Sequence, residues 1–273
     1  MYRRTIASVL AMALALVLGA AAPAYAQTVV ATIPVGAGPS SVAVNPRTNR
    51  IYVANRDSDT VSVIDGATNT VVSTIPVGYF PASVAVNAKI NRVYVANQFN
   101  YTISAIDGAT NTVVSTIPVE GGPTGVAVNA KTNRVYVTNG NDYVSVIDGA
   151  TNAVVTTLAV GDVAGVAVNE KTNRIYVARG SGAVSVIDGA SNFFMGTIQL
   201  GGSAYGVAVN ARTNRIYVTN PVSPIVTVLD GATNTVVTTV GVGAGPLGVI
   251  VNEKTGRVYV TNLNSNTVSV IQD

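Results

Sequence analysis

Short runs of alternating apolar and polar residues recur from residue 28 to the end of the chain, separated by Gly, Asn and Asp. This two-residue period is typical of β-strands, and no segment after residue 22 has the period of an amphipathic helix. Residues 50–69 show the unit clearly, with the sequence R-I-Y-V-A-N-R-D-S-D-T-V-S-V-I-D-G-A-T-N. The pattern predicts two strands joined by a polar loop and followed by an Asp-Gly turn.

The same unit returns five times after Arg50. It begins again at Arg92, Arg134, Arg174, Arg215 and Arg257, in steps of 42, 42, 40, 41 and 42 residues. A fixed period of this length, carrying strands and turns, predicts a propeller or another closed repeat array. Each full unit contains four strand patterns, of the forms V-A-V-N, Y-V-x-N, V-S-V-I-D and T-V-V-x-T-I-P-V.

The two ends of the chain predict how the ring closes. The last unit stops after three strand patterns, whereas residues 28–35 form a single copy of the fourth pattern. We therefore expect an all-β fold, a six-bladed β-propeller with four antiparallel strands per blade. In this propeller residues 28–35 pair with residues 267–271 and complete the last blade.

Residues 1–26 have the three-part pattern of a secretory signal peptide. Arg3 and Arg4 precede an apolar segment over residues 6–22, and an A-x-A cleavage site ends at Ala26. We expect cleavage after Ala26, with residues 27–273 forming one propeller domain that is secreted, periplasmic or at the cell surface. No later apolar run reaches the ~20 residues of a membrane span.

Composition narrows the chemistry that the domain can perform. The chain has no His and no Cys, so it lacks a Ser-His-Asp or Cys-His arrangement and His ligands for a metal or haem. Without Arg3 and Arg4, the chain has 14 basic and 13 acidic side chains, and this near-neutral balance disfavours nucleic-acid binding. We expect a protein that is not an enzyme and has no cofactor or metal site, while the sequence leaves its oligomeric state open.

Two alternatives involve catalysis. One is a hydrolase based on carboxylates, and the other is an accessory subunit of an envelope redox system. The loop acids from which an oxygen-only site could be assembled are Asp57, Asp59, Glu120, Asp142 and Asp162.

Residues that recur in every unit are expected to be structural. Five asparagines share a position with Gly256, which predicts a left-handed backbone there: Asn49, Asn91, Asn133, Asn173 and Asn214. The asparagines that end the V-A-V-N pattern are expected to cap their own turns, and the tyrosines of the Y-V pattern are expected in the core. Cross-strand ion pairs are expected for Arg50–Asp65, Arg92–Asp107, Arg134–Asp148, Arg174–Asp188 and Arg215–Asp230.

The Tyr-Val-[Ala/Thr]-Asn segments that begin at Tyr52, Tyr94, Tyr136, Tyr217 and Tyr259 resemble the YVTN-type β-propeller repeats of exported bacterial and archaeal surface-layer proteins. The resemblance covers essentially the whole chain after residue 26. The fourth copy departs from it, with Arg179 in place of Asn, and relatives often have seven blades where this chain has six units. The resemblance implies exported scaffolding or binding, and it carries over no catalytic residue.

The position of the variable residues predicts a binding face. Because consecutive antiparallel strands reverse direction, loops between the second and third strands lie on the same face as the connections between units. These loops differ among units, whereas the turns of the opposite face hardly vary. We call the first face the variable-loop face and expect it to bind a protein or a cell-envelope glycan. The candidate residues are Arg56, Asp57, Tyr79, Phe80, Phe99, Tyr101, Asp142, Tyr143, Arg179 and Tyr205.

Overall fold

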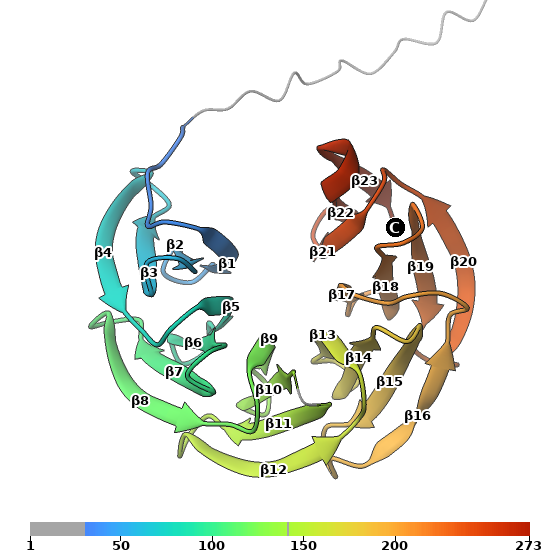
Figure 1. Cartoon of the computed structure of the whole chain (residues 1–273), viewed down its shortest axis with the longest axis horizontal. Coiled ribbons are helices and arrows are strands. Elements are labelled where there is room, and N and C mark those ends of the chain that lie inside the picture. Colours follow the sequence, from blue (N-terminus) through green and yellow to red (C-terminus); the bar gives the residue numbers. More distant parts are fainter. Residues whose placement is uncertain (1–30, 141) are drawn as a thin grey trace, which may run out of the picture. The chain divides into compact units, whose positions relative to one another are not determined.

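Six antiparallel β-sheets surround a central axis in the computed structural model of the protein (Figure 1). The structure describes residues 31–140 and 142–273, of which Ile33–Asp273 form one unit. Five sheets contain four strands each, and the last contains three. The predicted all-β, six-bladed propeller is therefore confirmed, and we number the sheets blades 1 to 6 in chain order.

Each blade runs from an inner strand at the central axis to an outer strand at the rim. Blade 1 contains β1 (Pro39–Asn45), β2 (Arg50–Asn55), β3 (Thr60–Asp65) and β4 (Thr70–Pro76). Blade 2 contains β5 (Pro81–Asn87), β6 (Arg92–Asn97), β7 (Thr102–Asp107) and β8 (Thr112–Pro118). Blade 3 contains β9 (Pro123–Asn129), β10 (Arg134–Asn139), β11 (Tyr143–Asp148) and β12 (Ala153–Ala159).

The second half of the ring repeats this order. Blade 4 contains β13 (Val163–Asn169), β14 (Arg174–Arg179), β15 (Ala183–Asp188) and β16 (Phe194–Gln199). Blade 5 contains β17 (Val207–Asn210), β18 (Arg215–Asn220), β19 (Ile225–Asp230) and β20 (Thr235–Gly241). Blade 6 contains β21 (Pro246–Asn252), β22 (Arg257–Asn262), a 3-10 turn (Leu263–Ser265) and β23 (Thr267–Gln272). No helix in the described part of the chain is long and apolar enough to cross a membrane.

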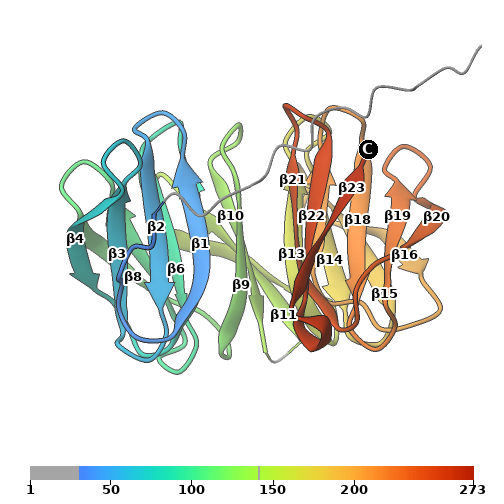
Figure 2. The ribbon, with the colours of Figure 1, turned by 90° about the horizontal axis from the view of Figure 1, so that it is seen from above.

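The two sets of variable loops lie on one face of the ring, as predicted. The Arg56 N–H donates to the Gly38 carbonyl (2.8 Å), and the Leu263 N–H donates to the Gly245 carbonyl (2.9 Å). Each bond joins a loop between second and third strands to the connection that precedes its blade. Figure 2 shows the strands running between this face and the opposite one.

The turns of the opposite face have the predicted backbone. The asparagine that precedes the second strand has a positive φ in five blades, from 52° to 57°, and Gly256 has a φ of 68°. In the Asp-Gly turns the left-handed residue is an asparagine such as Asn69 (φ 55°) rather than the glycine. The Asp65 carboxylate accepts the N–H groups of Ala67 and Thr68, and these bonds hold the pKa of Asp65 below its ordinary value.

Four of the five predicted cross-strand ion pairs form, with N–O distances of 2.5, 3.9, 2.9 and 3.2 Å in blades 1, 2, 3 and 5. The prediction for Arg174 and Asp188 is wrong. Arg174 donates to the Gly231 carbonyl of the next blade (2.5 Å), and Asp188 accepts the N–H (2.9 Å) and the hydroxyl (2.5 Å) of Ser191. Ser191 stands where most other units have Thr, and both of its bonds reach Oδ2 of Asp188, the oxygen that pairs with arginine in the other four blades.

The hydrophobic core lies between the blades. Five buried clusters occupy the five junctions from blades 1 and 2 to blades 5 and 6. Each contains a tyrosine of the second strand and valine or isoleucine from both blades. Five of the six strand tyrosines are buried as predicted, namely Tyr52, Tyr94, Tyr136, Tyr176 and Tyr217. Both faces of a central blade are therefore apolar, because each face covers a neighbour.

An amide hydrogen bond joins neighbouring blades at the inner strands. Nδ2 of the asparagine that ends an inner strand donates to Oδ1 of the asparagine in the left-handed turn of the next blade. The pairs, at 2.7–2.8 Å, are Asn45–Asn91, Asn87–Asn133, Asn129–Asn173 and Asn169–Asn214. In blade 6 Gly256 replaces the acceptor asparagine, and Asn210 donates instead to the Asp273 carboxylate. The inner-strand asparagines also accept N–H groups of their own turns, which confirms the predicted caps.

The junction between blades 6 and 1 differs from the other five. Side chains that match buried or partly buried positions elsewhere are exposed there: Val42, Val44, Ile250, Val268 and Val270. A cavity of about 610 Å³ lies at this junction, with Val44 and Pro46 on one side and residues of blade 6, including Ile250 and Tyr259, on the other. The two faces therefore do not pack as the other neighbouring blades do.

The predicted pairing of residues 28–35 with residues 267–271 is not formed by the described residues. Residues 28–30 lie outside them, and residues 31–35 adopt no strand, so the last sheet ends at β23. In blades 1 and 2 the outer strand is anchored by Ile75 and Ile117, which are buried between blades. Ile33, the matching residue, has no such cluster to enter because blades 6 and 1 are not packed together.

We expect the variant Asn129→Asp to lower the free energy of unfolding by about 1–3 kcal/mol, because it removes the buried Nδ2 donor to Asn173 but keeps the acceptor of the turn cap. Asn252→Asp is the matched control at the sixth junction, where Asn252 is exposed, and it should change stability by less than about 0.5 kcal/mol. Urea unfolding measures both, and equal losses would contradict a role for the inter-blade amide bond.

A second pair of variants tests whether the sixth junction is open in solution. Val146 is fully buried at the junction of blades 3 and 4, whereas the matching Val270 is 55% exposed. Val146→Ala should cost about 1–3 kcal/mol of unfolding free energy, and Val270→Ala less than about 0.5 kcal/mol. If thermal and urea unfolding give the same cost for both variants, blade 6 is covered in solution.

Candidate functional site

The connection between β4 and β5 on the variable-loop face is held by hydrogen bonds from both sides. The Phe80 N–H donates to Oδ1 of Asp59 in the preceding loop (2.9 Å), and the Tyr79 N–H donates to Oδ1 of Asn100 in the following loop. The Phe80 carbonyl accepts the Gln98 N–H (3.0 Å). These bonds fix the backbone from which two aromatic side chains project.

Three of the predicted binding residues stack on one another at this connection. The rings of Phe80 and Phe99 have centroids 4.4 Å apart and an interplanar angle of 27°. The Arg56 guanidinium lies 4.9 Å from the centroid of Phe80, and its Nε donates to Oδ1 of Asp57 (3.1 Å). Aromatic stacking and cation–π contacts each contribute roughly 0.5–1.5 kcal/mol. The stack therefore orders three side chains before any partner arrives.

Two aromatic residues of this region have a left-handed backbone. Phe80 has a φ of 57°, at a position that is occupied in two other connections by Gly38 (φ 61°) and Gly245 (φ 67°). Tyr101 has a φ of 56°, and the matching positions with positive φ in other units are held by Asp59, Asp142, Gly182 and Asn266. This backbone costs an ordinary residue roughly 1–2 kcal/mol and suits Gly, Asn and Asp. Backbone strain is therefore concentrated at two bulky residues of one surface.

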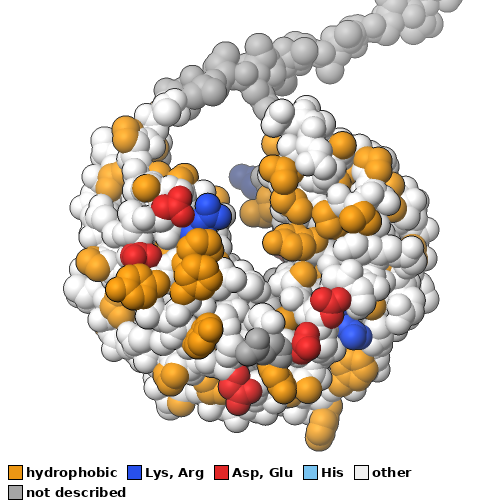
Figure 3. Space-filling view, in the orientation of Figure 1, with side chains coloured by type: hydrophobic (Ala, Val, Ile, Leu, Met, Phe, Trp, Pro, Cys, Tyr) orange, Lys and Arg blue, Asp and Glu red, His pale blue; other side chains and the backbone are white. Residues whose placement is uncertain are grey.

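Six of the predicted residues lie on the loops of this region, and we call them the aromatic patch: Arg56, Asp57, Tyr79, Phe80, Phe99 and Tyr101. The side chains of Tyr79 and Phe99 are each 63% exposed, and Tyr101 is 55% exposed. Figure 3 shows hydrophobic side chains gathered beside acidic and basic groups on the side of the ring that β1 to β8 occupy. An exposed aromatic surface on ordered loops is typical of a binding site.

The structure does not bring the other four predicted residues to the patch. Asp142 and Arg179 secure the connection between blades 3 and 4, where Oδ1 of Asp142 accepts the Asp162 N–H and Nε of Arg179 donates to the Gly161 carbonyl (2.9 Å). Tyr143 begins β11 and is partly buried. Tyr205 is exposed at the mouth of the central cavity.

The central cavity has a volume of about 610 Å³ and is lined by all six blades. Small residues at the start of the inner strands form much of its wall: Ser41, Ser83, Gly125, Gly165, Gly206 and Gly248. Asp162 is the one acidic side chain among the residues that line it. The cavity thus presents backbone and small polar groups rather than a converging set of acids.

Three of the five loop acids bind groups of their own or a neighbouring loop. Asp57 binds Arg56, Asp59 accepts the Phe80 N–H, and Asp142 accepts the Asp162 N–H. Within residues 31–140 and 142–273, no group of three or more His, Cys, Asp or Glu could hold a metal ion.

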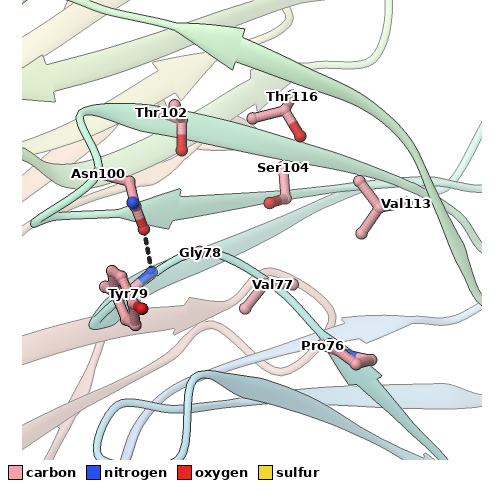
Figure 4. A pocket seen from close by; sticks show the side chains of 9 residues that line it. All are labelled: Pro76, Val77, Gly78, Tyr79, Asn100, Thr102, Ser104, Val113 and Thr116. Atoms are coloured by element: carbon pink, nitrogen blue, oxygen red, sulfur yellow. Dashed lines mark hydrogen bonds between the residues drawn. The ribbon is translucent and has the colours of Figure 1, made fainter.

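A groove that the sequence does not predict lies beside Tyr79 (Figure 4). It has a volume of about 500 Å³ and lies where the connection after β4 meets blade 2. Its lining residues are Pro76, Val77, Gly78, Tyr79, Asn100, Thr102, Ser104, Val113 and Thr116. The alternation of Thr102 and Ser104 with apolar residues indicated only a strand, because their nearness to Tyr79 depends on how two blades pack.

The scan against protein-family models found no match, and the comparison with curated proteins found no similar sequence. Among solved structures, the chain is similar to Kuenenia stuttgartiensis hydrazine synthase, with a TM-score of 0.78 and 22% sequence identity. The match covers 86% of this chain and 83% of that chain. At this identity the likeness supports the propeller fold alone.

The strain at Tyr101 predicts a stabilising substitution. Tyr101→Asn places at this left-handed position the residue that blade 6 has there, and it should raise the free energy of unfolding by up to about 1 kcal/mol. The reciprocal variant Asn266→Tyr should lower it by a similar amount. Urea unfolding of both variants measures the effect, and a loss of stability in Tyr101→Asn would show that the tyrosine side chain contributes more than its backbone costs.

Proposed function

We propose that the protein is an exported propeller scaffold that binds a partner outside the cytoplasm through the aromatic patch and catalyses no reaction itself. The signal-peptide pattern of residues 1–26 supports export, and the resemblance of the repeats to YVTN-type propellers supports a scaffolding or binding role. The six-bladed ring supplies a rigid base for the loops, which is how binding surfaces are commonly built.

The observation that carries the proposal is the left-handed backbone of Phe80 and Tyr101. Where other units have a left-handed backbone at these positions, the residue is Gly, Asp or Asn, so the fold does not need an aromatic residue at either one. Strained residues persist where a function favours them. Neutral divergence between duplicated units would not favour two bulky residues at strained positions of the same surface.

The arrangement of the patch also suits binding. Arg56, Phe80 and Phe99 are held in one stack, so a partner orders few additional side chains when it binds. This lowers the conformational entropy that association would otherwise lose, by about 0.5–1.5 kcal/mol for each side chain already ordered. Arginine and aromatic residues are also the side chains that most often dominate binding energy.

A second candidate is an accessory subunit of an enzyme of the cell envelope, including a redox enzyme. It draws support from the structural likeness to a protein whose name is that of an enzyme, hydrazine synthase. In this case the patch would bind the catalytic subunit. The two candidates differ in the identity of the partner and share the binding surface.

The test is capture of partners from the cell envelope and culture fluid by the wild-type protein and by Phe80→Gly. This variant relieves the strained backbone and loses the ring stack, two effects of similar size and opposite sign, so its stability should stay within about 1 kcal/mol of wild type. We expect its capture of the partner to fall by about tenfold or more.

Ile90→Thr is the control on the opposite face. Ile90 is an exposed apolar residue in the turn between β5 and β6, and the other five units have Thr at this position. The Ile90→Thr variant should capture the same amount of partner as the wild-type protein does. If Phe80→Gly captures the same partners in the same amounts as wild type, the patch is not the binding surface.

A further inference from the structure

The groove beside Tyr79 is neutral and rich in hydroxyl groups. None of its nine lining residues is charged, and its polar groups are the hydroxyls of Tyr79, Thr102, Ser104 and Thr116 and the amide of Asn100. In Figure 4, Tyr79 and Asn100 lie at one end of the groove and Val113 lies at the other. The groove therefore combines an aromatic ring, aliphatic wall and several hydrogen-bonding groups.

Two of these hydroxyls are oriented by a buried asparagine. Nδ2 of Asn97 donates to Oγ1 of Thr102 (3.1 Å) and to Oγ of Ser104 (2.9 Å). Because Oγ1 of the partly exposed Thr102 accepts this bond, its O–H remains able to donate to a ligand. Asn97 and Ser104 are both buried, so the positions of these groups are set before binding.

The next junction provides a natural comparison. The corresponding groove between blades 2 and 3 has a volume of about 290 Å³ and is lined by Pro118, Val119, Glu120, Ser145, Val154 and Thr157. Glu120 takes the place of Gly78, and Gly121 takes the place of Tyr79. The same fold thus forms the second groove with a charged residue and without an aromatic ring. Packing between blades therefore does not require Tyr79 in the first groove.

We propose that the Tyr79 groove binds a neutral sugar unit of a glycan. The inference rests on the proposed function, because Tyr79 also belongs to the aromatic patch. A sugar ring offers an apolar face that can pack on an aromatic ring and a rim of hydroxyls that can pair with hydroxyl and amide groups. The volume lies within the range of roughly 300–1,000 Å³ that is usual for small-ligand sites.

The absence of charged side chains from the lining of the described groove selects among sugars. An acidic sugar would lose hydration of its carboxylate there without gaining a cationic partner, which is costly. The basic residue of the aromatic patch, Arg56, already binds Asp57 and lies over the Phe80 ring. The groove therefore favours neutral sugars, and a longer glycan would continue from Tyr79 across Phe80 and Phe99.

The test uses the full chain and immobilised hexasaccharides of glucose, mannose and N-acetylglucosamine, with a hexasaccharide of a uronic acid as the charged probe. We expect at least one neutral hexasaccharide to bind. The affinity for the uronic-acid hexasaccharide should be lower by about tenfold or more. Calorimetry then gives the affinity for variants. Tyr79→Ala should weaken binding about tenfold or more, and Thr116→Val about threefold to tenfold.

Thr157→Val is the matched control, because Thr157 occupies in the second groove the position of Thr116 in the first. It should leave the affinity unchanged. The proposal is overturned if no neutral hexasaccharide binds at millimolar concentration, if the uronic acid binds equally well, or if Tyr79→Ala binds as wild type does.

The outcome separates this inference from the proposed function. If no neutral glycan binds but Phe80→Gly still loses its envelope partner, the groove is not a sugar site and the patch binds a protein. If Phe80→Gly also keeps its partner, both proposals are wrong.

Discussion

Packing between neighbouring blades is the contact on which the rest of the structure depends. Each blade is a small sheet with two apolar faces, and neither face can be left in water without losing the hydrophobic stabilisation of its valines and isoleucines. The five buried clusters satisfy this requirement at five junctions, and the amide bonds such as Asn129–Asn173 fix how far neighbouring blades are turned and shifted relative to one another. The chain has no cysteine, so no disulfide shares this role.

The same packing explains why the two faces of the ring differ in how many side-chain changes they tolerate. The turns of the face opposite the variable loops contain the left-handed asparagines, the turn caps and the amide acceptors, so a change there disturbs a junction as well as a turn. The loops of the variable-loop face are tied mainly through backbone bonds, which any residue can make. Their side chains can therefore change without loss of the fold, and strained aromatic residues such as Phe80 and Tyr101 can be supported by the stability of the ring.

The junction of blades 6 and 1 shows how much a blade depends on its neighbours. The three strands of blade 6 have sequences like those of the other blades, yet Val268 and Val270 are exposed because no apolar face of the described residues lies against them. Its tyrosine, Tyr259, is partly exposed for the same reason. A repeat therefore encodes the internal structure of a blade, whereas burial of its faces is a property of two repeats together.

The strand order, the register of the hairpins and the left-handed turns follow from the amino-acid sequence, because they depend on period-two alternation and on Asn, Asp and Gly within about ten residues. The number of blades follows from the repeat of 40–42 residues, and the variable residues fall on one face because strand direction alternates. Tertiary packing sets which of these residues meet, why Arg174 binds Gly231 rather than Asp188, and how Thr102 and Ser104 come to lie in a groove with Tyr79. These features join residues of different blades or different loops, and their geometry depends on packing distances that no single repeat contains.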